Sequence, residues 1–425
     1  MSKPIVITGY PYAYPYYFKV FEYVQNKDDL IFILPKHWEA KGGKIKIDLK
    51  KRDDFKIFGL SVWSYGARSL LGGLFKGWMP SICVILPYFR LRYSSRVLYS
   101  CLEPNLLTTL YNGFWAKLFG YKHVLFTWQN IAPEKRMSGL KLKLSNALVK
   151  LNLVLSDGII CGNTRAAEII KHFEISRCRN IEMLVCPLSG VDTERFEPVG
   201  NVGIVGDVGN DGNDGDDRND GDVRNVRDGQ VQQIQQVKRS DAKFILFYGA
   251  LEKRKGINIL IDAFQLLTTR YSLLARLVVV GTGPEKDSYG LRITDYGLKN
   301  KTIFLDWMSN DELPSLLNSV DVFVYPSVPL GGWEEQFGYA MAEASACGVP
   351  VVSTKTGSVD EVVIDGKSGI LVESNNSEQL ADAINKILSD KEQAEQMGRF
   401  GREHVVKNYS HPVIANKLIL FLKQF

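Results

Sequence analysis

The chain has 425 residues, of which 45% are hydrophobic and 23% charged, a composition that excludes a wholly disordered polypeptide and a length that favours two domains. Its formal net charge is +5. Because residues 199–241 hold nine Asp against five Lys and Arg, a net −4, the rest of the chain carries +9. This charge suits phosphates or an anionic membrane surface as partners. No interleaved basic and aromatic motif supports nucleic acid, so none is expected.

The cysteines are far apart and form no CxxC pair, which indicates neither a zinc site nor a disulfide framework. They are Cys83, Cys101, Cys161, Cys178, Cys186 and Cys347. No apolar run approaches the length of a membrane-spanning helix, and the N-terminal residues read as a strand, with no secretion signal evident. We therefore expect a cytoplasmic protein.

Short apolar, β-branched runs alternate with longer helical patterns, which predicts two parallel sheets flanked by helices. The first series is 4–8, 30–34, 82–86, 97–101, 123–128, 158–161 and 181–186. The second is 243–249, 276–281, 302–305, 321–325, 349–353 and 369–372. We expect an N-terminal domain over 1–198 and a C-terminal domain over 242–408. A last helix, over 409–425, is expected to return to the N-terminal domain.

Between the two series lies 199–241, a low-complexity segment rich in Asp, Gly and Asn. Its Asp214-Gly-Asp216 and Asp220-Gly-Asp222 words invite a calcium or metal-binding interpretation. An EF-hand loop would need a Glu at its twelfth position, however, and a metal-holding Asp-x-Asp normally follows a strand. The composition favours a disordered insertion.

Two strand ends in the second series carry groups suited to phosphate. Phe244–Tyr248 runs into Gly249 and then the cations Lys253, Arg254 and Lys255. The next strand ends in Gly281-Thr-Gly283, where a ligand can approach the backbone closely. Ligands usually bind at this carboxyl edge of an open α/β sheet. A solvated basic turn and an ordinary glycine turn are the simpler alternatives.

The stretch from Trp333 to Ser353 reads as a loop, a helix, a glycine stop and a strand, with the helix beginning near Phe337. Helical spacing would project Glu335 and Glu343 within about 80° of each other. Backbone N–H groups at the helix start suit a phosphate, and carboxylates accept hydrogen bonds from sugar hydroxyls. Dipole stabilisation of the helix is the simpler interpretation, and we accept it for Glu334.

In these motifs residues 95–410 resemble the retaining glycosyltransferases of family 4 (group 1). The most specific element is EQFGYAMAEASACGVPVVS, followed by Gly357-Ser-Val-Asp-Glu361 and Asp365-Gly-Lys-Ser-Gly-Ile-Leu-Val372. Weaker matches are KRKGINILIDAF, GTGP, Asp321–Ser327 and the hinge-like Pro187–Phe196. The resemblance implies a GT-B fold, in which two Rossmann-like domains face a cleft.

The resemblance also implies a reaction: transfer of a hexose from a nucleotide-diphosphate sugar to a glycan or lipid-linked acceptor, with retention and without a metal. Lys255 would hold the diphosphate, Glu335 the transferred sugar and Glu343 the ribose hydroxyls. Gly338 and Tyr339 would offer backbone groups to the phosphates. The remaining donor-binding residues are expected to be Gly249, Arg254, Gly281, Gly283 and Phe337. No cofactor is expected, because protein cations and helix dipoles stabilise the leaving diphosphate.

Two departures leave a second function open, a nucleotide-sugar-binding protein that is catalytically weak or inactive. Ala250 stands where the family commonly has an Arg, so Arg254 or Lys253 would have to replace it. Gln129 and Asn130 occupy the position of a His in many members. Other acceptor-side candidates are Gly9, Tyr10 and Glu103, whose neighbours include an aromatic run over 10–17 that either stacks on an acceptor or packs a loop.

A basic amphipathic helix is predicted between Lys135 and Leu153, where leucines alternate with lysines and Glu134 is the nearest acid. Residues 66–78 are similar but interrupted by glycines. Such a helix rests on the inner face of an anionic membrane or forms an ordinary domain surface. The sequence therefore leaves two interpretations of this helix, peripheral contact with the membrane and an ordinary domain surface.

Overall fold

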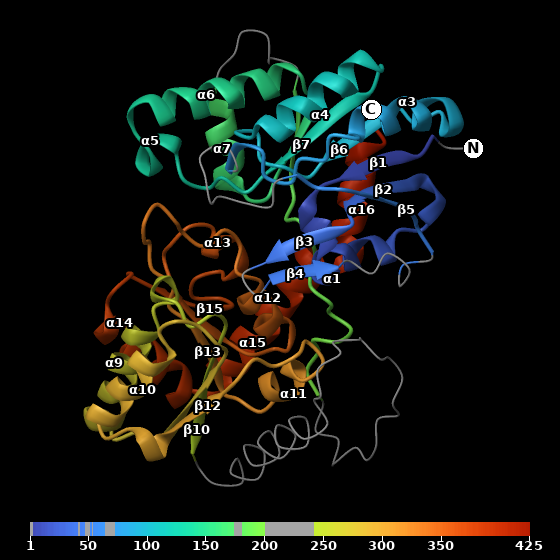
Figure 1. The fold of residues 1–425 in the computed structure, drawn as a ribbon. Coiled ribbons are helices and arrows are strands. Elements are labelled where there is room, and N and C mark those ends of the chain that lie inside the picture. The colour runs from blue at the N-terminus through green and yellow to red at the C-terminus, as the bar shows by residue number, and fades with distance from the viewer. Residues whose placement is uncertain are drawn as a thin grey trace. The chain divides into compact units, whose positions relative to one another are not determined.

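The computed structural model describes residues 3–40, 43–46, 52, 54–63, 73–173, 181–199 and 242–425. These residues form two compact units, each built on its own sheet (Figure 1). The first unit comprises Met1–Gly190, Gly331–Phe337 and Asn408–Phe425, and the second comprises Val191–Leu330 and Gly338–Lys407. The predicted low-complexity insertion, beyond Val199, and Cys178 lie outside the described residues.

The first unit contains a seven-stranded parallel sheet in the order β5-β2-β1-β6-β7-β8-β9. Its strands are β1 (Ile5–Thr8), β2 (Leu30–Pro35), β5 (Lys56–Leu60), β6 (Val97–Ser100), β7 (Lys122–Thr127), β8 (Gly158–Cys161) and β9 (Glu182–Val185). A separate antiparallel pair is formed by β3 (His37–Ala40) and β4 (Gly43–Lys46).

Helices cover both faces of this sheet, and alternate residues of β1 show which face each helix covers (Figure 1). Val6 packs in a core with Ile82 of α3, whereas Ile7 packs in another core with Ile414 of α16. The helices that follow β5 to β8 are α3 (Ile82–Tyr93), α4 (Leu107–Leu118), α5 (Pro133–Arg136), α6 (Gly139–Val154) and α7 (Thr164–His172). The remaining helices are η1 (Tyr10–Ala13), α1 (Pro15–Phe18), η2 (Lys19–Tyr23), η3 (Lys27–Asp29) and α16 (His411–Leu422).

The second unit contains a six-stranded parallel sheet in the order β12-β11-β10-β13-β14-β15. Its strands are β10 (Lys243–Tyr248), β11 (Ala275–Val280), β12 (Thr302–Leu305), β13 (Val322–Tyr325), β14 (Val351–Thr354) and β15 (Gly369–Val372). Its helices are η5 (Lys253–Lys255), α9 (Ile257–Thr269), α10 (Lys286–Asp295), η6 (Lys299–Lys301), α11 (Leu313–Leu317), α12 (Tyr339–Ala346), α13 (Val359–Val362), α14 (Ser377–Ser389) and α15 (Lys391–Tyr409). The helix α9 contacts both α10 and α14.

The predicted α/β class is confirmed, one predicted strand is wrong, and one strand was not predicted. The apolar run 82–86 is the first part of α3, because only Ile82, Leu86 and Phe89 are buried while Val84 is 71% exposed, a helical and not a sheet pattern. The edge strand β5 was not predicted, because its sequence, KIFGL, contains a charged residue and a glycine, which are uncommon in strands.

Candidate functional site

The cationic turn after β10 places one lysine inside the protein. Lys255 is only 6% exposed, and its Nζ lies 4.7 Å from the ring centroid of Tyr325, the last residue of the neighbouring strand β13. A buried ammonium is costly unless an aromatic face or an anion compensates it. Lys255 is therefore a buried cation at the carboxyl edge of the second sheet, beside the aromatic face of Tyr325.

Two strand ends meet tightly at the same edge. Gly249 donates its backbone N–H to Val280 over 3.0 Å, and Gly281 follows with a φ of 137°. A Cβ at Gly281 would lie 2.0 Å from the Gly249 carbonyl oxygen, so only glycine fits there. A Cβ at Gly283 would lie 2.4 Å from the carbonyl oxygen of Leu251. The glycines predicted as donor-binding thus serve close backbone packing at the end of β10 and β11.

The helix α12 begins at Tyr339, two residues later than the predicted start at Phe337. Gly338 is its N-cap with a φ of 87°, a left-handed conformation that ends the preceding loop, and no side chain caps the helix. Glu335 therefore lies in the loop, and the helical spacing that related it to Glu343 does not apply. An N-terminus without a side-chain cap is the kind of helix end that suits a phosphate.

Glu343 lies within α12 and is 4% exposed. The hydroxyl of Tyr248, the last residue of β10, donates a hydrogen bond to its carboxylate. Burial, followed by the charge of Glu343, raises the pKa of Tyr248 well above its ordinary value. Tyr248 thus holds the Glu343 side chain in place, a role that the sequence did not reveal because an aromatic residue at a strand end usually packs a core.

This hydrogen bond leads to a prediction for Tyr248→Phe. The substitution leaves the buried Glu343 short of one donor, so we expect the free energy of unfolding to fall by about 1–3 kcal/mol. Tyr289→Phe is the matched control, because the buried Tyr289 hydroxyl has no hydrogen-bond partner among the described residues and its removal should be nearly neutral. Urea denaturation measures both. Equal effects of the two substitutions would show that the Glu343 contact contributes nothing.

The two cations considered as replacements for the Arg absent at Ala250 differ in their surroundings. The Arg254 Nε donates to Glu252 over 2.7 Å, and that side chain is 30% exposed. Lys253 is 72% exposed, with its Nζ 3.9 Å from Glu285. Each cation is thus near a carboxylate of the same unit. Of the two cations, Arg254 is the less exposed, and its guanidinium is oriented by the hydrogen bond to Glu252.

The loop Gly331–Phe337 belongs to the first unit, where side chains at the strand ends hold its backbone. Asn130, after β7, donates its amide N–H to the carbonyl oxygen of Glu335 over 2.8 Å. Asn163, after β8, donates to the carbonyl oxygen of Gln336 over 2.9 Å. The ring of Phe337 lies edge-on to Tyr409, with centroids 5.0 Å apart. Asn130 therefore positions the loop that carries Glu335, which is 8% exposed.

The acceptor-side candidates gather at the carboxyl edge of the first sheet. Tyr10, directly after Gly9 and β1, stacks on Trp38 with ring centroids 4.5 Å apart and planes 2° apart. The Lys76 Nζ lies 4.4 Å from the Tyr10 ring centroid. Burial, followed by the charge of Glu103, raises the pKa of Tyr10 above its ordinary range. Tyr10 therefore packs within an aromatic and cationic cluster.

Glu103 follows β6 in the same cluster. Its carboxylate accepts hydrogen bonds from the Thr127 hydroxyl over 2.8 Å and from the Trp128 backbone N–H over 2.9 Å. Burial raises the pKa of the Glu103 carboxyl, although these hydrogen bonds and the charges of Arg136 and Lys76 oppose the shift. Glu103 is thus a carboxyl group with a raised pKa, held by two donors at a sheet edge.

The predicted residues therefore form one group in each unit. The first unit brings together Gly9, Tyr10, Glu103, Gln129, Asn130, Glu335 and Phe337. The second unit brings together Gly249, Arg254, Lys255, Gly281, Gly283, Gly338, Tyr339 and Glu343. Near these groups the structure adds four residues that the sequence did not single out, Trp38, Lys76, Tyr248 and Tyr325.

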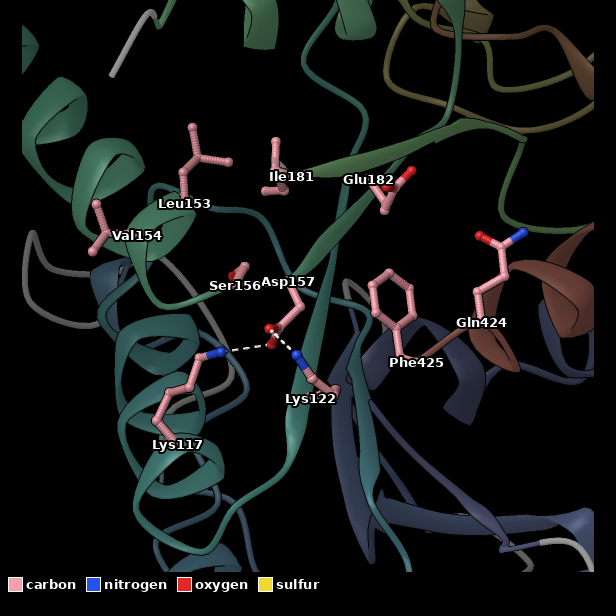
Figure 2. Close-up of a pocket in the computed structure, with 10 residues that line it drawn as sticks. All are labelled: Lys117, Lys122, Leu153, Val154, Ser156, Asp157, Ile181, Glu182, Gln424 and Phe425. Carbon is pink, nitrogen blue, oxygen red and sulfur yellow. Dashed lines mark hydrogen bonds and ion pairs between the residues drawn. The ribbon is translucent and has the colours of Figure 1, made fainter. Parts of the chain in front are cut away.

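A separate cavity of about 500 Å³ lies in the first unit, at the amino end of β7, β8 and β9 (Figure 2). Figure 2 shows Lys117 and Lys122 both directed at Asp157, with Nζ–O distances of 2.6 and 3.0 Å. No residue predicted for the site lines it. The two lysines are paired with Asp157, so we assign the cavity no ligand.

Over the described ranges, no group of three His, Cys, Asp or Glu side chains is placed to hold a metal ion. In the same ranges no helix has the length and apolarity needed to cross a bilayer.

Comparison with known families and proteins concerns mainly the second unit. Residues 230–404 match the family model described as glycosyl transferases group 1. An uncharacterized glycosyltransferase of Methanocaldococcus jannaschii is 33% identical over 181 residues, which are 43% of this chain and 45% of that protein. The GDP-mannose-dependent alpha-(1-6)-phosphatidylinositol monomannoside mannosyltransferase of Mycobacterium tuberculosis is 34% identical over 175 residues, 41% of this chain and 45% of that protein. The matches thus span under half the length of these relatives.

Similarity to solved structures extends over the whole chain. The Anabaena HepE protein in complex with UDP has a TM-score of 0.70 and 17% identity, with all of both chains covered. At this identity the likeness shows the fold alone. The predicted pair of Rossmann-like domains is confirmed, and so is the resemblance to group 1 glycosyl transferases over residues 230–404.

Proposed function

We propose that this chain, whose residues 230–404 match the family model of the group 1 glycosyl transferases, moves a hexose from a nucleotide-diphosphate sugar to a glycan or lipid-linked acceptor. The observation that carries the proposal is the buried Lys255, beside Tyr325 at the carboxyl edge of the second sheet, in the segment that matches the glycosyl transferase family model. A cation and free backbone N–H groups are the groups that bind a diphosphate. The relative from Mycobacterium tuberculosis is named as a GDP-mannose-dependent enzyme, which supports a nucleotide sugar as donor.

In the proposed reaction Lys255 and the helix N-terminus stabilise the charge that develops on the leaving diphosphate. Glu343, held by Tyr248, accepts hydrogen bonds from the ribose hydroxyls. Glu335 contacts the transferred hexose, and Asn130 fixes the backbone of its loop. The leaving phosphate takes the acceptor proton, and the sugar keeps its anomeric configuration. No metal is part of the proposed mechanism.

We further propose that Glu103 binds a hydroxyl of the acceptor. Its carboxylate is anchored by Thr127 and Trp128, and it lies where the family's His is replaced by Gln129 and Asn130. The aromatic pair of Tyr10 and Trp38 in the same cluster offers a surface on which a sugar ring can stack. Glu103 thus supplies the acidic group that the two amides lack.

Glu103→Gln tests this role. We expect transfer to the acceptor to fall about tenfold to a hundredfold, because a hydrogen bond to the acceptor is weakened, while donor affinity stays unchanged. Since the pKa of Glu103 is raised, wild-type transfer should decline on the acid side at a pH above the ordinary value for Glu, and the variant should lose that step. Glu134→Gln, at an exposed carboxylate of α5, is the control. An equal loss of donor affinity in Glu103→Gln would contradict the assignment.

Turnover is the test of the function as a whole. The full chain is incubated with a panel of nucleotide sugars and candidate acceptors, and released nucleoside diphosphate and the product's anomeric configuration are measured. We expect acceptor-dependent release with retention. Donor binding without release across the panel would instead favour the second candidate, an inactive nucleotide-sugar-binding protein, which Ala250 and the missing His motivate.

We also propose that the chain acts in the cytoplasm, at the inner face of the membrane. The cysteines of the described residues, Cys83, Cys101, Cys161, Cys186 and Cys347, are all free thiols, which supports a reducing compartment. The basic helix α6 supports contact with an anionic surface.

A further inference from the structure

Positive charge is concentrated in one segment of the first unit. Residues 82–156 contain ten Lys and Arg against two acids, Glu103 and Glu134, a net +8. The whole chain outside 199–241 carries +9, so this segment supplies nearly all of it. The helices α3, α4 and α6 lie in this segment, and none of the three contains an Asp or Glu.

The outer side of α6 combines this charge with exposed leucines. Leu140 is 83% exposed, and Leu144 and Leu151 are exposed as well. At about 100° per residue these three leucines fall within about 40° of one another on the helix. Lys141 lies on one side of this stripe, and Lys143 and Lys150 lie on the other. None of the three lysines takes part in an ion pair within the described parts of the chain.

The two neighbouring helices expose further apolar side chains. On α3, Val84, Tyr88 and Leu91 follow an i, i+4, i+7 spacing that places them on one face, and Leu91 is 85% exposed. On α4, Phe114 and Leu118 are exposed one turn apart. Each helix also buries its opposite side against the sheet, so these side chains point outward.

The three helices form a continuous layer. The helix α4 contacts both α3 and α6, and Figure 1 shows the three side by side over the same face of the sheet. We call their outer side the α3–α4–α6 face. Its exposed apolar residues are Val84, Tyr88, Leu91, Phe114, Leu118, Leu140, Leu144, Leu151 and Val154, and its exposed cations include Arg92, Lys141, Lys143 and Lys150.

We propose that the α3–α4–α6 face docks on an anionic lipid bilayer without crossing it. Long apolar side chains flanked by lysines on one helix surface are the features of an interfacial helix: the apolar groups enter the boundary of the acyl chains, and the ammonium groups reach lipid phosphates. The absence of any acid from the three helices removes the repulsion that an anionic surface would otherwise meet. This inference deepens the membrane contact proposed above and does not depend on donor chemistry.

Vesicle flotation of the full chain tests the proposal. Vesicles of phosphatidylcholine alone are compared with vesicles that also contain phosphatidylglycerol. We expect binding to the second kind, and we expect Lys141→Gln/Lys143→Gln/Lys150→Gln to weaken it about a hundredfold. Lys386→Gln/Lys391→Gln/Lys407→Gln removes the same charge from exposed positions of the second unit and should bind like the wild type.

The apolar contribution is tested in the same way. Leu91→Ser/Leu140→Ser should lower binding to the anionic vesicles, whereas Leu274→Ser/Leu291→Ser, at exposed positions of the second unit, should not. If each variant of the α3–α4–α6 face and its control in the second unit lost the same amount of vesicle binding, the docking face would be overturned. The binding would then be a general attraction of a basic protein to anionic lipid. Failure of the wild type to bind would also overturn it and would direct attention to an acidic protein as the partner. Because flotation needs no donor or acceptor, its failure is distinguishable from a failure of glycosyl transfer.

Discussion

Glu335→Ala should lower the rate of glycosyl transfer by about a hundredfold to a thousandfold, the cost of losing one group that acts on the reacting sugar. Glu335 is 8% exposed, in a loop whose backbone is fixed by Asn130. The backbone of Glu335 is thus held in place, and alanine cannot replace its carboxylate. The affinity for the nucleoside diphosphate should remain, because the proposed contact is to the sugar. The measurement is kcat with saturating donor, beside a titration with the diphosphate alone.

Two further variants separate chemistry from folding in this experiment. Glu335→Gln keeps the volume of the side chain and should also be inactive if the charge is required. Glu334→Ala removes the adjacent carboxylate, which forms a 3.9 Å ion pair with the partly exposed Arg165, and should keep most activity. Wild-type rates in Glu335→Ala, or an equal loss in Glu334→Ala, would contradict the role of Glu335.

Lys255→Met should have the second large effect. The methionine keeps the apolar stem that packs beside Tyr325 but removes the charge. We expect the affinity for the diphosphate to fall at least about tenfold and kcat to fall about a hundredfold or more, because a charge-assisted contact in a buried site is lost. Binding calorimetry with the diphosphate measures the first effect, and initial rates measure the second.

The control for this variant is Lys301→Met, at an exposed lysine of η6 that precedes β12. It lowers the net charge by the same amount and should leave both quantities unchanged. A loss of transfer with unchanged diphosphate affinity in Lys255→Met would assign Lys255 to the sugar and not to the diphosphate. Unchanged affinity and rate together would remove Lys255 from the site.

Much of the fold follows from local sequence. Buried strands such as β2 and β10 are continuous apolar runs, the pattern of a parallel sheet covered on both faces. The run 82–86 is equally apolar but is helical. Only one side of it is buried, and this is decided by tertiary packing, which the local sequence does not show. The start of α12 was misplaced for a similar reason: the left-handed Gly338 ends the loop, and the apolar Phe337 packs on Tyr409 far along the chain.

The candidate site was predicted to the extent that its residues lie close together in the sequence. Lys255, Gly281 and Glu343 each belong to a local motif at a strand end or helix start. Tyr248 and Tyr325 were not predicted as site residues, because their roles arise from neighbouring strands that meet only in the folded sheet. The anchoring of the Glu335 loop by Asn130 joins residues 205 positions apart, a separation that no local pattern can report.

The central claim, that the chain binds a nucleotide sugar through Lys255, is tested most directly by thermal denaturation in the presence of UDP-, GDP- and ADP-sugars. A donor at a hundred times its dissociation constant should stabilise the folded chain by about 2.7 kcal/mol, so at least one of them should raise the Tm in a concentration-dependent way. The same donor should produce a much smaller shift in Lys255→Met. No shift with any nucleotide sugar, or an undiminished shift in Lys255→Met, would contradict the account.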